Sequence, residues 1–437
     1  MMKKLWQKTG TKTAKIVHKY IISENLTEDQ ILLPYDIIAS IAHVKMLNKI
    51  KILNDKEVSN IIGSLKEIYK LNEMGNFQLA GKYEDCHSAI ENFLIEKLGD
   101  IGKKIHTGRS RNDQILVAIR LYTKDKIKGL EKASLSLAKQ ILKFSKKYEF
   151  VAMPGYTHTQ QAMPSSVGQW AGNFIEALLD DLKLLQCAFS LNDQNPLGSA
   201  SGFGTSINID REETTKLLNF AKTQVNSLYC QNSRGKFESF TISSLSQLMM
   251  TLGKIANDII WFTSYEFNFF QIDKSLTTGS SIMPQKQNLD ILEVLRANVS
   301  VIMSYDFQIK TAYHNLFSGY NKDLKISKHA LIESFNITLN SINVIETVFK
   351  KIKPNINKLK KSFSKDIFAT DLANEMVSKG IPFREAYKQV GENLNKIKIP
   401  DLQKNLKSKI SLGAPGNLGL NFYEKELLKN CNEIINF

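Results

Sequence analysis

Prolines are scarce in this chain, and their positions constrain the fold more than any other feature. Only nine occur in 437 residues, and none lies between Pro34 and Pro154. Because proline removes a backbone N–H and disrupts a helix interior, this gap permits very long helices. From residue 113 to about 148, apolar side chains repeat at helical spacing, from Ile115 to Phe144. The stripe predicts one helix of over thirty residues, about 50 Å long.

Similar stripes predict four more long helices and one shorter helix, while strand-type alternation is scarce. The segments are 165–191, 241–272, 289–315, 324–350 and the shorter 57–69. Helices with a single apolar face bury that face against one another. We therefore predict an all-α fold, a long-helix bundle flanked by two small helical domains. Gly99–Gly108 and the lysine-rich segment Lys351–Ser362 suggest the boundaries. They divide the chain into an N-terminal helical domain (1–108), a central bundle carrying the oligomer core (109–355) and a C-terminal helical domain (356–437).

The net charge of +15 raises the possibility of a nucleic-acid partner. The basic residues, however, are 51 Lys and only 7 Arg, and the Lys are scattered through every segment. Specific nucleic-acid sites favour Arg and a focused patch, so we expect no nucleic-acid partner. The seven His show no metal-ligand spacing and no nucleotide fingerprint is present, so we expect no metal and no cofactor.

The amino terminus and the cysteines indicate the compartment. Met1–Lys8 is basic, but no apolar h-region follows it, and no run of 18 apolar residues occurs anywhere. The four cysteines are far apart and form no CxxC pair, which argues against a disulfide framework. We expect a cytoplasmic protein without a membrane partner.

The segment Thr277–Asn288 is predicted to begin as a loop, because it opens with small and hydroxylated residues. It also contains side chains that could take part in a reaction. Ser280 is a potential base, Lys286 a cation and Asn288 an amide that can bind carboxylate oxygens. A serine removes a proton from carbon only if its own charge is stabilised, which an ammonium and backbone N–H groups can do. A Gly-Ser-Ser sequence alone is usually a plain turn. The longer run through Lys286 and Asn288 is far more specific.

A second polar segment, His106–Gln114, directly precedes the longest predicted helix. The amino terminus of a helix carries partial positive charge and free N–H groups. Together with Ser110, Arg111 and Asn112 it could cradle a carboxylate. The alternative is a simple helix cap by Asn112 or Asp113 with solvated arginines.

Two more polar segments follow. In Met153–Pro164, two prolines bracket a loop in which His158 lies among hydroxyl and amide groups, a setting that suits holding a carboxylate. A lone His is nevertheless more often structural. In Ser318–Lys328, Tyr320, Lys325 and Lys328 lie within two turns, and the two lysines can share one helix face. Here the alternative is a solvated helix cap.

The four segments together, in this order, resemble the argininosuccinate lyase family of the fumarase/aspartase superfamily. The resemblance covers essentially the whole chain, because it extends through Tyr35–His43, Glu84–Ser88, Asn195–Ala200 and Gly380–Tyr387. It implies a carbon–nitrogen lyase that converts argininosuccinate to L-arginine and fumarate by non-hydrolytic β-elimination, in arginine biosynthesis. It also implies a homotetramer whose sites draw residues from three subunits.

The resemblance also assigns roles by position. Catalytic roles fall on Ser280, His158, Lys286, Glu293 and Thr157. Substrate contacts fall on Ser110, Arg111, Asn112, Asn288, Arg234, Tyr320, Lys325 and Lys328. Ser280 would take the β-proton of the substrate, and the resulting carbanion would be delocalised into the neighbouring carboxylate. His158, paired with Glu293, is the candidate acid for the leaving nitrogen, although the sequence does not identify that acid.

Three departures from the family pattern bear on substrate affinity. Leu289 follows Asn288 where the family usually has proline, and Lys325 stands where the family has glutamine. The segment Ile21–Asp29 also lacks most of the polar run that the family usually has there. Two alternatives stay open. Another fumarate-releasing lyase, such as adenylosuccinate lyase, is disfavoured by the runs Arg109–Gln114 and Gly319–Asp323. A catalytically weakened homologue, like the lens crystallins of this family, is supported only by Lys325 and Leu289.

Overall fold

The computed structural model describes Ile16, Tyr20, residues 26–79 and residues 83–436, so the basic segment Met1–Lys8 lies outside the described residues. The chain divides into two compact units. Unit 1 comprises residues 1–129, 184–245 and 302–336, and unit 2 comprises residues 130–183, 246–301 and 337–437. Each of the five long helices contributes one part of its length to each unit.

The five long helices that span both units occupy the segments that the apolar stripes predicted. They are α6 (Arg111–Lys147), α7 (Val167–Asn192), α10 (Lys236–Thr263), α11 (Asp290–Tyr313) and α12 (Ile326–Lys351). The longest, α6, has 37 residues, which confirms the helix predicted from the proline gap. Each of these helices buries one apolar face in a core. That face appears in the sequence as a stripe, which is why the stripes predicted the helices. Helix α2 (Leu26–Lys49) is as long as α11 but was not predicted from a stripe.

The prediction of helix through residue 272 was wrong. The helix α10 ends at Thr263, and the chain turns through Asn268, which has a left-handed φ of 46°. It then enters strand β5 (Phe270–Ile272), which pairs antiparallel with β8 (Ile352–Pro354). Phe269 and Phe270 are buried beside Phe262, so these apolar side chains continue the stripe although the backbone has left the helix.

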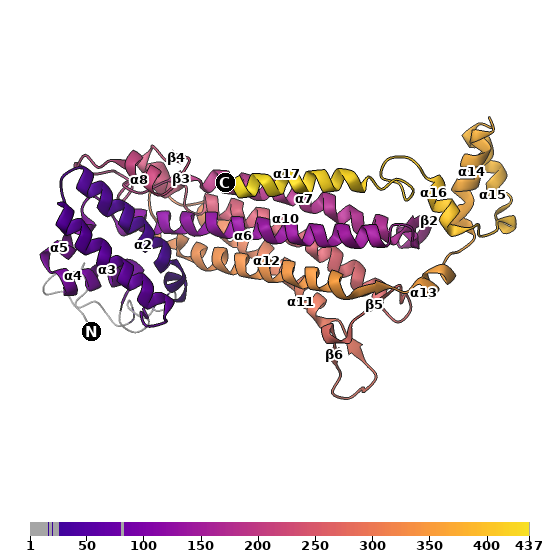
Figure 1. Ribbon diagram of the computed structural model, residues 1–437, viewed down its shortest axis with the longest axis horizontal. Helices are drawn as coiled ribbons and strands as arrows, with labels where there is room; N and C mark the ends of the chain where they lie inside the picture. The colour runs from indigo at the N-terminus through magenta and orange to yellow at the C-terminus, as the bar shows by residue number, and fades with distance from the viewer. Residues whose placement is uncertain (1–15, 17–19, 21–25, 80–82, 437) are drawn as a thin grey trace. The chain divides into compact units, whose positions relative to one another are not determined.

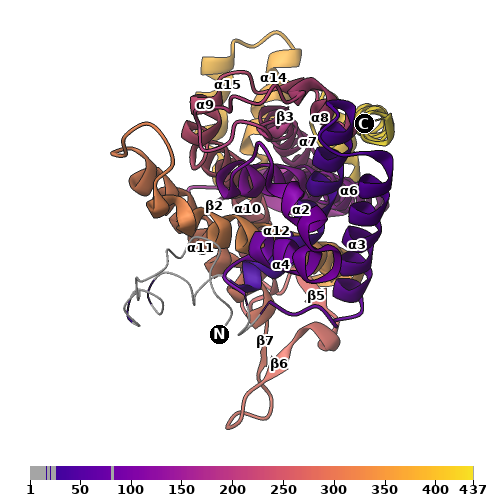
Figure 2. The same cartoon turned by 90° about the vertical axis from the view of Figure 1, so that its left-hand side faces the viewer.

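Unit 1 contains a small helical cluster formed by α2 (Leu26–Lys49), α3 (Asp55–Glu73) and α4 (Cys86–Leu98), visible in indigo in Figure 2. Leu33, Ile61 and Leu65 belong to its core and are fully buried. Asn54 and Glu57 form a capping box that starts α3, the helix predicted from residues 57–69. The remaining short elements are α5 (Asp100–Lys103), η1 (Lys104–His106), α8 (Arg211–Leu217), α9 (Ser227–Asn232), η3 (Lys322–Lys325) and the parallel pair β3 (Gln194–Asn195) and β4 (Lys222–Thr223).

Unit 2 is held by an aromatic core between its long helices. Trp170 of α7 lies 4.9 Å from Phe270, 6.0 Å from Phe262 and 6.1 Å from Phe349, measured between ring centroids. After α12 come α13 (Ile356–Lys361), η4 (Asp366–Phe368), α14 (Ala369–Ser378), α15 (Phe383–Gly391), η5 (Leu394–Lys396), α16 (Leu402–Ser408) and α17 (Leu420–Asn436). These seven elements form the C-terminal part of unit 2.

Two antiparallel hairpins extend from the helices of unit 2. One consists of β1 (Ala152–Thr157) and β2 (Gln160–Ser166), in the segment that the sequence predicted as a loop. Pro154 faces Pro164 in this hairpin, and a two-stranded sheet tolerates both prolines because each strand has a free edge. The other consists of β6 (Thr278–Gly279) and β7 (Gln287–Asn288), which follow the short helix η2 (Lys274–Leu276) and project beyond the end of α11 (Figures 1 and 2).

Candidate active site

Unit 1 contains a cavity of about 240 Å³ in which six of the predicted site residues meet. Five parts of the chain form it: α2, the start of α4, the first turns of α6, the segment around Arg234, and η3 with the first turn of α12. Its charged and polar lining consists of Asp29, Glu84, Asp85, His87, Arg111, Asn112, Arg234, Tyr320, Lys322, Lys325 and Lys328. Five arginines and lysines face three carboxylates, so the cavity suits an anionic ligand.

The amino terminus of α6 borders this cavity. The Ser110 hydroxyl accepts a hydrogen bond from the Asn112 N–H at 3.3 Å, and Asp113 Oδ1 accepts one from the Ser110 N–H at 2.8 Å. Ser110 is therefore the N-cap of α6. The alternative that Asn112 or Asp113 caps the helix is wrong, because Asp113 lies inside the first turn and its side chain reaches back to the Ser110 N–H. Arg111 and Asn112 line the cavity, so the positive end of the helix dipole lies beside it.

Asp113 ties the start of α6 to a distant turn. Its buried Oδ2 accepts hydrogen bonds from the N–H groups of Gly198 at 2.9 Å and Ala200 at 3.0 Å, both of which have left-handed φ. Burial raises the pKa of Asp113 to about 6, against the opposing effect of its backbone donors and Arg109. The carboxyl group thus fixes the position of the helix end that lines the cavity.

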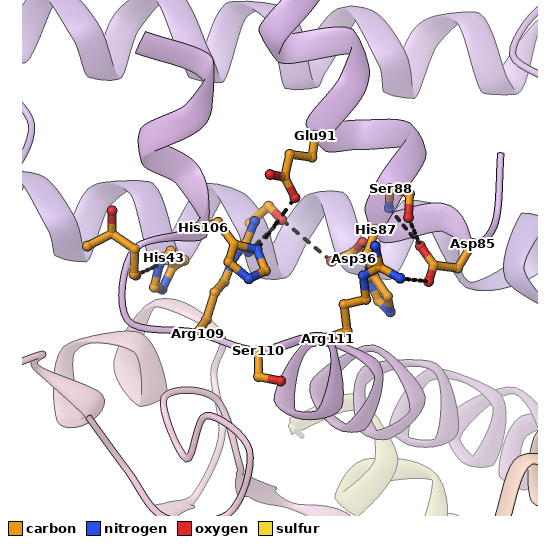
Figure 3. Close-up of polar contacts among 12 residues, drawn as sticks. Asp36, His43, Asp85, His87, Ser88, Glu91, His106, Arg109, Ser110 and Arg111 are labelled. Atoms are coloured by element: carbon orange, nitrogen blue, oxygen red, sulfur yellow. Dashed lines mark hydrogen bonds and ion pairs between the residues drawn. The ribbon is translucent and has the colours of Figure 1, made fainter. Parts of the chain in front are cut away.

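Arg111 is held by acidic side chains at the start of α4 (Figure 3). Its Nη1 lies 3.3 Å from Asp85 Oδ2 and 3.5 Å from Glu84 Oε2. The other oxygen of Asp85 accepts hydrogen bonds from the Ser88 N–H at 2.7 Å and the Ser88 hydroxyl at 2.6 Å. Burial alone would raise the pKa of Asp85, but His87, Arg111 and Ser88 together lower it. The ionised carboxylate therefore orients the guanidinium.

His87 forms a buried ion pair with Asp36 (Figure 3). Its Nδ1 lies 2.7 Å from Asp36 Oδ2, and the Asp36 side chain is fully buried. Burial alone would lower the pKa of His87, but the charge and hydrogen bond of Asp36, followed by Asp85 and Asp29, raise it overall. Asp36 therefore favours the protonated form of the imidazole in the cavity wall. The other Asp36 oxygen contacts the Ser40 hydroxyl at 3.5 Å, to which Arg109 donates at 3.0 Å.

One group among the described residues has the composition of a metal site. A carboxylate oxygen of Asp36, the thiol of Cys86 and a ring nitrogen of His87 lie within 4.8 Å of one another. The raised pKa of His87 favours a protonated imidazole, which has no lone pair for a metal. Burial also raises the pKa of Cys86 well above its ordinary value, so this thiol stays protonated. The group fits the ion pair better than a metal centre.

The opposite wall of the cavity comes from the Tyr320–Lys328 segment. Lys328 Nζ donates to Asp29 Oδ1 at 2.6 Å, and both side chains are at least nine-tenths buried. The Arg234 guanidinium lies 5.3 Å from the centroid of the Tyr320 ring, a cation–π distance. Lys325 belongs to the 3₁₀ turn η3 and Lys328 to the first turn of α12, so they do not share one continuous α-helix, yet both line the cavity.

Five acidic or imidazole side chains of this region were not predicted as site residues from the sequence: Asp29, Asp36, Glu84, Asp85 and His87. The run Glu84–Ser88 was recognised as part of the family pattern but received no role. A signal was available, because a cluster of acidic residues and a histidine directly before an apolar helix is unusual. The partners of these side chains are distant in sequence, so the pairs themselves were not accessible.

In unit 2, Thr157 and His158 lie exposed at the turn of the β1–β2 hairpin. Thr157 pairs with Gln160, and the two turn residues between them, His158 and Thr159, have φ of 53° and 61°. Positive φ at both central residues is the signature of a type I′ hairpin turn. Thr157 also lines a cavity of about 1020 Å³ between the hairpin and the C-terminal part of unit 2.

Ser280, Lys286 and Asn288 belong to the β6–β7 hairpin and its connecting loop. The Ser280 hydroxyl oxygen accepts hydrogen bonds from the N–H groups of Ile282 at 3.3 Å and Met283 at 3.1 Å. Such donors stabilise negative charge on the oxygen. Lys286 is exposed, whereas Ser280 and Asn288 are partly exposed. Glu293 is exposed in the first turn of α11.

The structure therefore divides the predicted residues into two groups. Arg111, Asn112, Arg234, Tyr320, Lys325 and Lys328 line one cavity in unit 1, next to the helix cap formed by Ser110. The residues with predicted catalytic roles, Thr157, His158, Ser280, Lys286 and Glu293, belong to unit 2, as does Asn288, which was predicted as a substrate contact. There they lie on two hairpins and one helix start.

Comparisons with known proteins agree on the type of protein. Residues 9–304 match a family model described as "Lyase", and residues 366–405 match one described as "Argininosuccinate lyase C-terminal". The argininosuccinate lyase of Thermotoga neapolitana is 42% identical over 91% of this chain and 100% of its own length. That of Sorangium cellulosum is 37% identical over 98% of this chain and 99% of its own length.

Solved structures show the same fold at lower sequence identity. An EDDS lyase in complex with formate has a TM-score of 0.82 at 22% identity, covering 98% of this chain and 93% of its own. A class II fumarase from Schistosoma mansoni has a TM-score of 0.70 at 17% identity, covering 86% of this chain and 90% of its own. The predicted all-α, fumarase/aspartase-like fold is thereby confirmed.

Proposed function

Since the chain belongs to the argininosuccinate lyase family, we propose that it splits argininosuccinate into L-arginine and fumarate by non-hydrolytic β-elimination. The observation that carries this proposal is the cationic cavity of unit 1, where the Ser110–Asn112 and Tyr320–Lys328 segments meet. The succinyl part of argininosuccinate carries two carboxylates, and its amino-acid end carries a third. A cavity with five arginines and lysines beside a helix amino terminus offers partners for these three carboxylates.

Ser280 is the proposed base. It takes the β-proton of the succinyl part, and the C–H electron pair is delocalised into the neighbouring carboxylate. Ser280 Oγ accepts hydrogen bonds from the N–H groups of Ile282 and Met283. These donors would stabilise the negative charge on the oxygen after the hydroxyl proton is lost. The electron pair then forms the double bond of fumarate while the C–N bond breaks.

The remaining chemistry needs partners for charge and one acid. We assign Lys286, Asn288 and Thr157 to the doubly charged carboxylate of the intermediate, where ammonium and polar hydrogen atoms are worth most. We assign His158, with Glu293 setting its charge, to protonating the leaving nitrogen. His158 is exposed at a turn in the single chain. It would act as this acid only within an assembled site, where other groups surround the imidazole.

We further propose a homotetramer with composite sites drawing residues from three subunits. The hairpins that carry the proposed chemistry are exposed, whereas the cavity with the proposed substrate ligands is lined by unit 1 alone. Helices α10 and α11 also expose large apolar side chains: Met250 by 48%, Trp261 by 58%, Met303 by 50% and Phe307 by 70%. Such surfaces mark protein–protein contacts, which supports assembly through these helices.

Subunit mixing tests the composite site. Ser280→Ala and His158→Asn, each strongly impaired alone, should regain activity when combined in mixed oligomers, because some sites then contain neither lesion. A matched control combines Ser280→Ala with Lys286→Met. Both lesions lie on the same hairpin, so every site in that mixture stays damaged. Complete failure of the first mixture, with mixed oligomers proven by native mass spectrometry, would show that single chains build the site.

We place the reaction in arginine biosynthesis in the cytoplasm, without nucleic-acid or membrane partners. Over the described part of the chain, no helix has the length and apolar character needed to cross a membrane. The described cysteines are all free, as a reducing compartment requires.

The direct test is to incubate purified protein with argininosuccinate, and separately with adenylosuccinate, and to follow fumarate by absorbance. Fumarate from argininosuccinate alone is the expected result. Release from adenylosuccinate alone would move the substrate assignment to another lyase. A folded protein that binds argininosuccinate without releasing fumarate would fit a homologue that has lost its activity.

A further inference from the structure

The side chain of Gln161 connects the β1–β2 hairpin to the C-terminal part of unit 2. Its Nε2 donates to the Ser362 carbonyl at 2.6 Å, and its Oε1 accepts from the Ser364 N–H at 3.0 Å. A single half-buried amide thus bonds two backbone groups two residues apart, as a neighbouring strand would. Both partners lie in the linker between α13 and η4.

The linker is itself fixed, so it can serve as an anchor. Phe363, between the two bonded residues, is 6% exposed and belongs to an apolar cluster with Ala152 at the base of β1. Phe368 of η4 stacks on it with ring centroids 6.0 Å apart. The cluster also contains Leu406 of α16, so the anchor is continuous with the C-terminal helices.

The end of the hairpin is also supported by the Tyr156 ring, whose centroid lies 5.9 Å from that of Phe267 and 6.4 Å from that of Phe269, but these contacts do not reach the turn residues. The strand register shifts between Pro154 and Tyr156, and beyond that irregularity two residue pairs remain, Tyr156 with Gln161 and Thr157 with Gln160. A ladder this short is marginal alone. One flank of this end lines the cavity of about 1020 Å³, so packing leaves room there. The left-handed turn at His158 and Thr159 is a conformation that surrounding contacts must maintain.

We propose that Gln161 is a positioning residue, whose amide fixes the turn that presents His158 to the substrate. This inference rests on the role proposed for His158 in the lyase reaction. The amide bonds the last-but-one residue pair of the hairpin to a packed linker, and it thereby holds the imidazole at a constant place relative to the C-terminal helices. A displacement of about 1 Å at such a group can slow a reaction by roughly two orders of magnitude.

A purely structural hydrogen bond and a positioning one predict different kinetics. Loss of a structural bond lowers the thermal stability and leaves the rate per folded molecule unchanged. Loss of positioning lowers kcat, while KM changes little because the proposed substrate ligands line the cavity of unit 1. The split between kcat and KM therefore separates the two roles.

The test uses the full-length enzyme with Gln161→Met, which keeps the side-chain length and removes both hydrogen bonds. Gln161→Asn is a second variant, which stays polar but is too short to reach both partners. The matched control is Gln169→Met on α7. It removes two similar amide bonds, one to the Gly413 carbonyl at 2.9 Å and one from the Ser165 hydroxyl at 2.7 Å, which lies at the other end of the hairpin from its turn. We expect kcat to fall at least tenfold in both Gln161 variants, with KM within threefold, and to stay within twofold in the control.

A double-mutant cycle shows whether Gln161 acts through His158. Adding Gln161→Met to His158→Asn should cause no further loss of kcat, because no imidazole is left to position. An unchanged kcat in both Gln161 variants, or an equal tenfold loss in the His158→Asn background, would overturn the inference and leave the proposed lyase mechanism intact. If His158→Asn were itself as active as the wild type, the assignment of His158 would fail first, and this inference with it.

Discussion

The cavity of unit 1 and the hairpins of unit 2 are built in opposite ways. In the cavity, charged side chains are paired: Lys328 with Asp29 and His87 with Asp36, which are buried, and Arg111 with Asp85, which are partly buried. On the hairpins, His158 and Lys286 are exposed, and Ser280 bonds only to the backbone of its own loop. The charged groups of the cavity therefore have partners within the chain, whereas the groups on the hairpins are largely exposed to solvent.

The difference follows from the cost of burying charge. A cationic cavity is effective only if its charges are desolvated, and desolvated charges need fixed partners within the folded chain. Small polar groups such as serine, threonine and neutral histidine can be exposed at little cost until a substrate or another subunit covers them. We infer that unit 1 is organised for binding in advance, and that the hairpins complete the site on assembly.

The strongest test of this division removes the proposed base. Ser280→Ala should lower kcat by roughly 10⁴-fold, the upper end of what a positioned proton-transfer group contributes. Argininosuccinate affinity, measured by calorimetry on the inactive variant, should stay near the wild-type value because the cavity is untouched. A variant within tenfold of the wild-type rate would exclude Ser280 as the base and remove the chemistry from this hairpin.

The second hairpin should show a smaller effect of the same kind. His158→Asn should lower kcat by roughly 10²–10⁴, again with little change in binding. Glu293→Gln should act in the same direction but less, since it would act through the imidazole. Steady-state kinetics at saturating substrate measures both. Full activity of Glu293→Gln would show that the proposed pair does not operate.

The exposed hairpins and the buried cavity also differ in how far the sequence could predict them. Helix α6 was predictable because the proline gap and the apolar stripe are local signals. The hairpin residues Ser280 and His158 were found because they lie in compact, unusual runs of sequence. The pair Lys328–Asp29 could not be predicted, because the two residues are 299 positions apart and nothing in the sequence around Asp29 indicates a lysine partner.

Two local features were also misjudged, for physical reasons. The stripe of α10 was extended to residue 272 because Phe269 and Phe270 continue the apolar pattern, although they pack from a strand after a turn. The segment 153–164 was predicted as a loop because its prolines disfavour a ladder. A two-stranded hairpin accommodates both, since neither proline needs to donate on its free edge.

The buried pairs of unit 1 predict a pH signature that the exposed hairpins lack. Asp36, through a hydrogen bond at 2.7 Å, raises the pKa of His87 against the effect of burial. A histidine with a raised folded pKa stabilises the protein below about pH 6.5, its ordinary value, and this stabilisation is lost as pH rises through the folded pKa. Urea unfolding should therefore show stability falling from about pH 6.5 upward.

Asp36→Asn should weaken this pH dependence, because the asparagine cannot hold a protonated imidazole. It should also cost about 1–3 kcal/mol of unfolding free energy below that pH, the usual value for a hydrogen bond to a charged group. His158→Ser serves as the control, because that imidazole is exposed and its loss should leave the pH dependence of stability unchanged. Identical pH profiles for the wild type and Asp36→Asn would show that His87 is not a buried cation, and would weaken the contrast between the regions.

The smallest expected effect concerns Lys325, which stands where the family has glutamine. It lines the same cavity as Lys322, Lys328, Arg111 and Arg234. There it can bind the α-carboxylate of the substrate, but it also repels the α-ammonium and the guanidinium. We predict that Lys325→Gln improves the apparent affinity for argininosuccinate while kcat changes little, because the amino-acid end does not react. A partly exposed charge should contribute about 1 kcal/mol or less, so KM should fall by up to about fivefold. Steady-state kinetics of both proteins at one ionic strength decides the sign. A clear rise in KM would make Lys325 a substrate ligand in its own right, and would show that all five cations of the cavity are organised for binding.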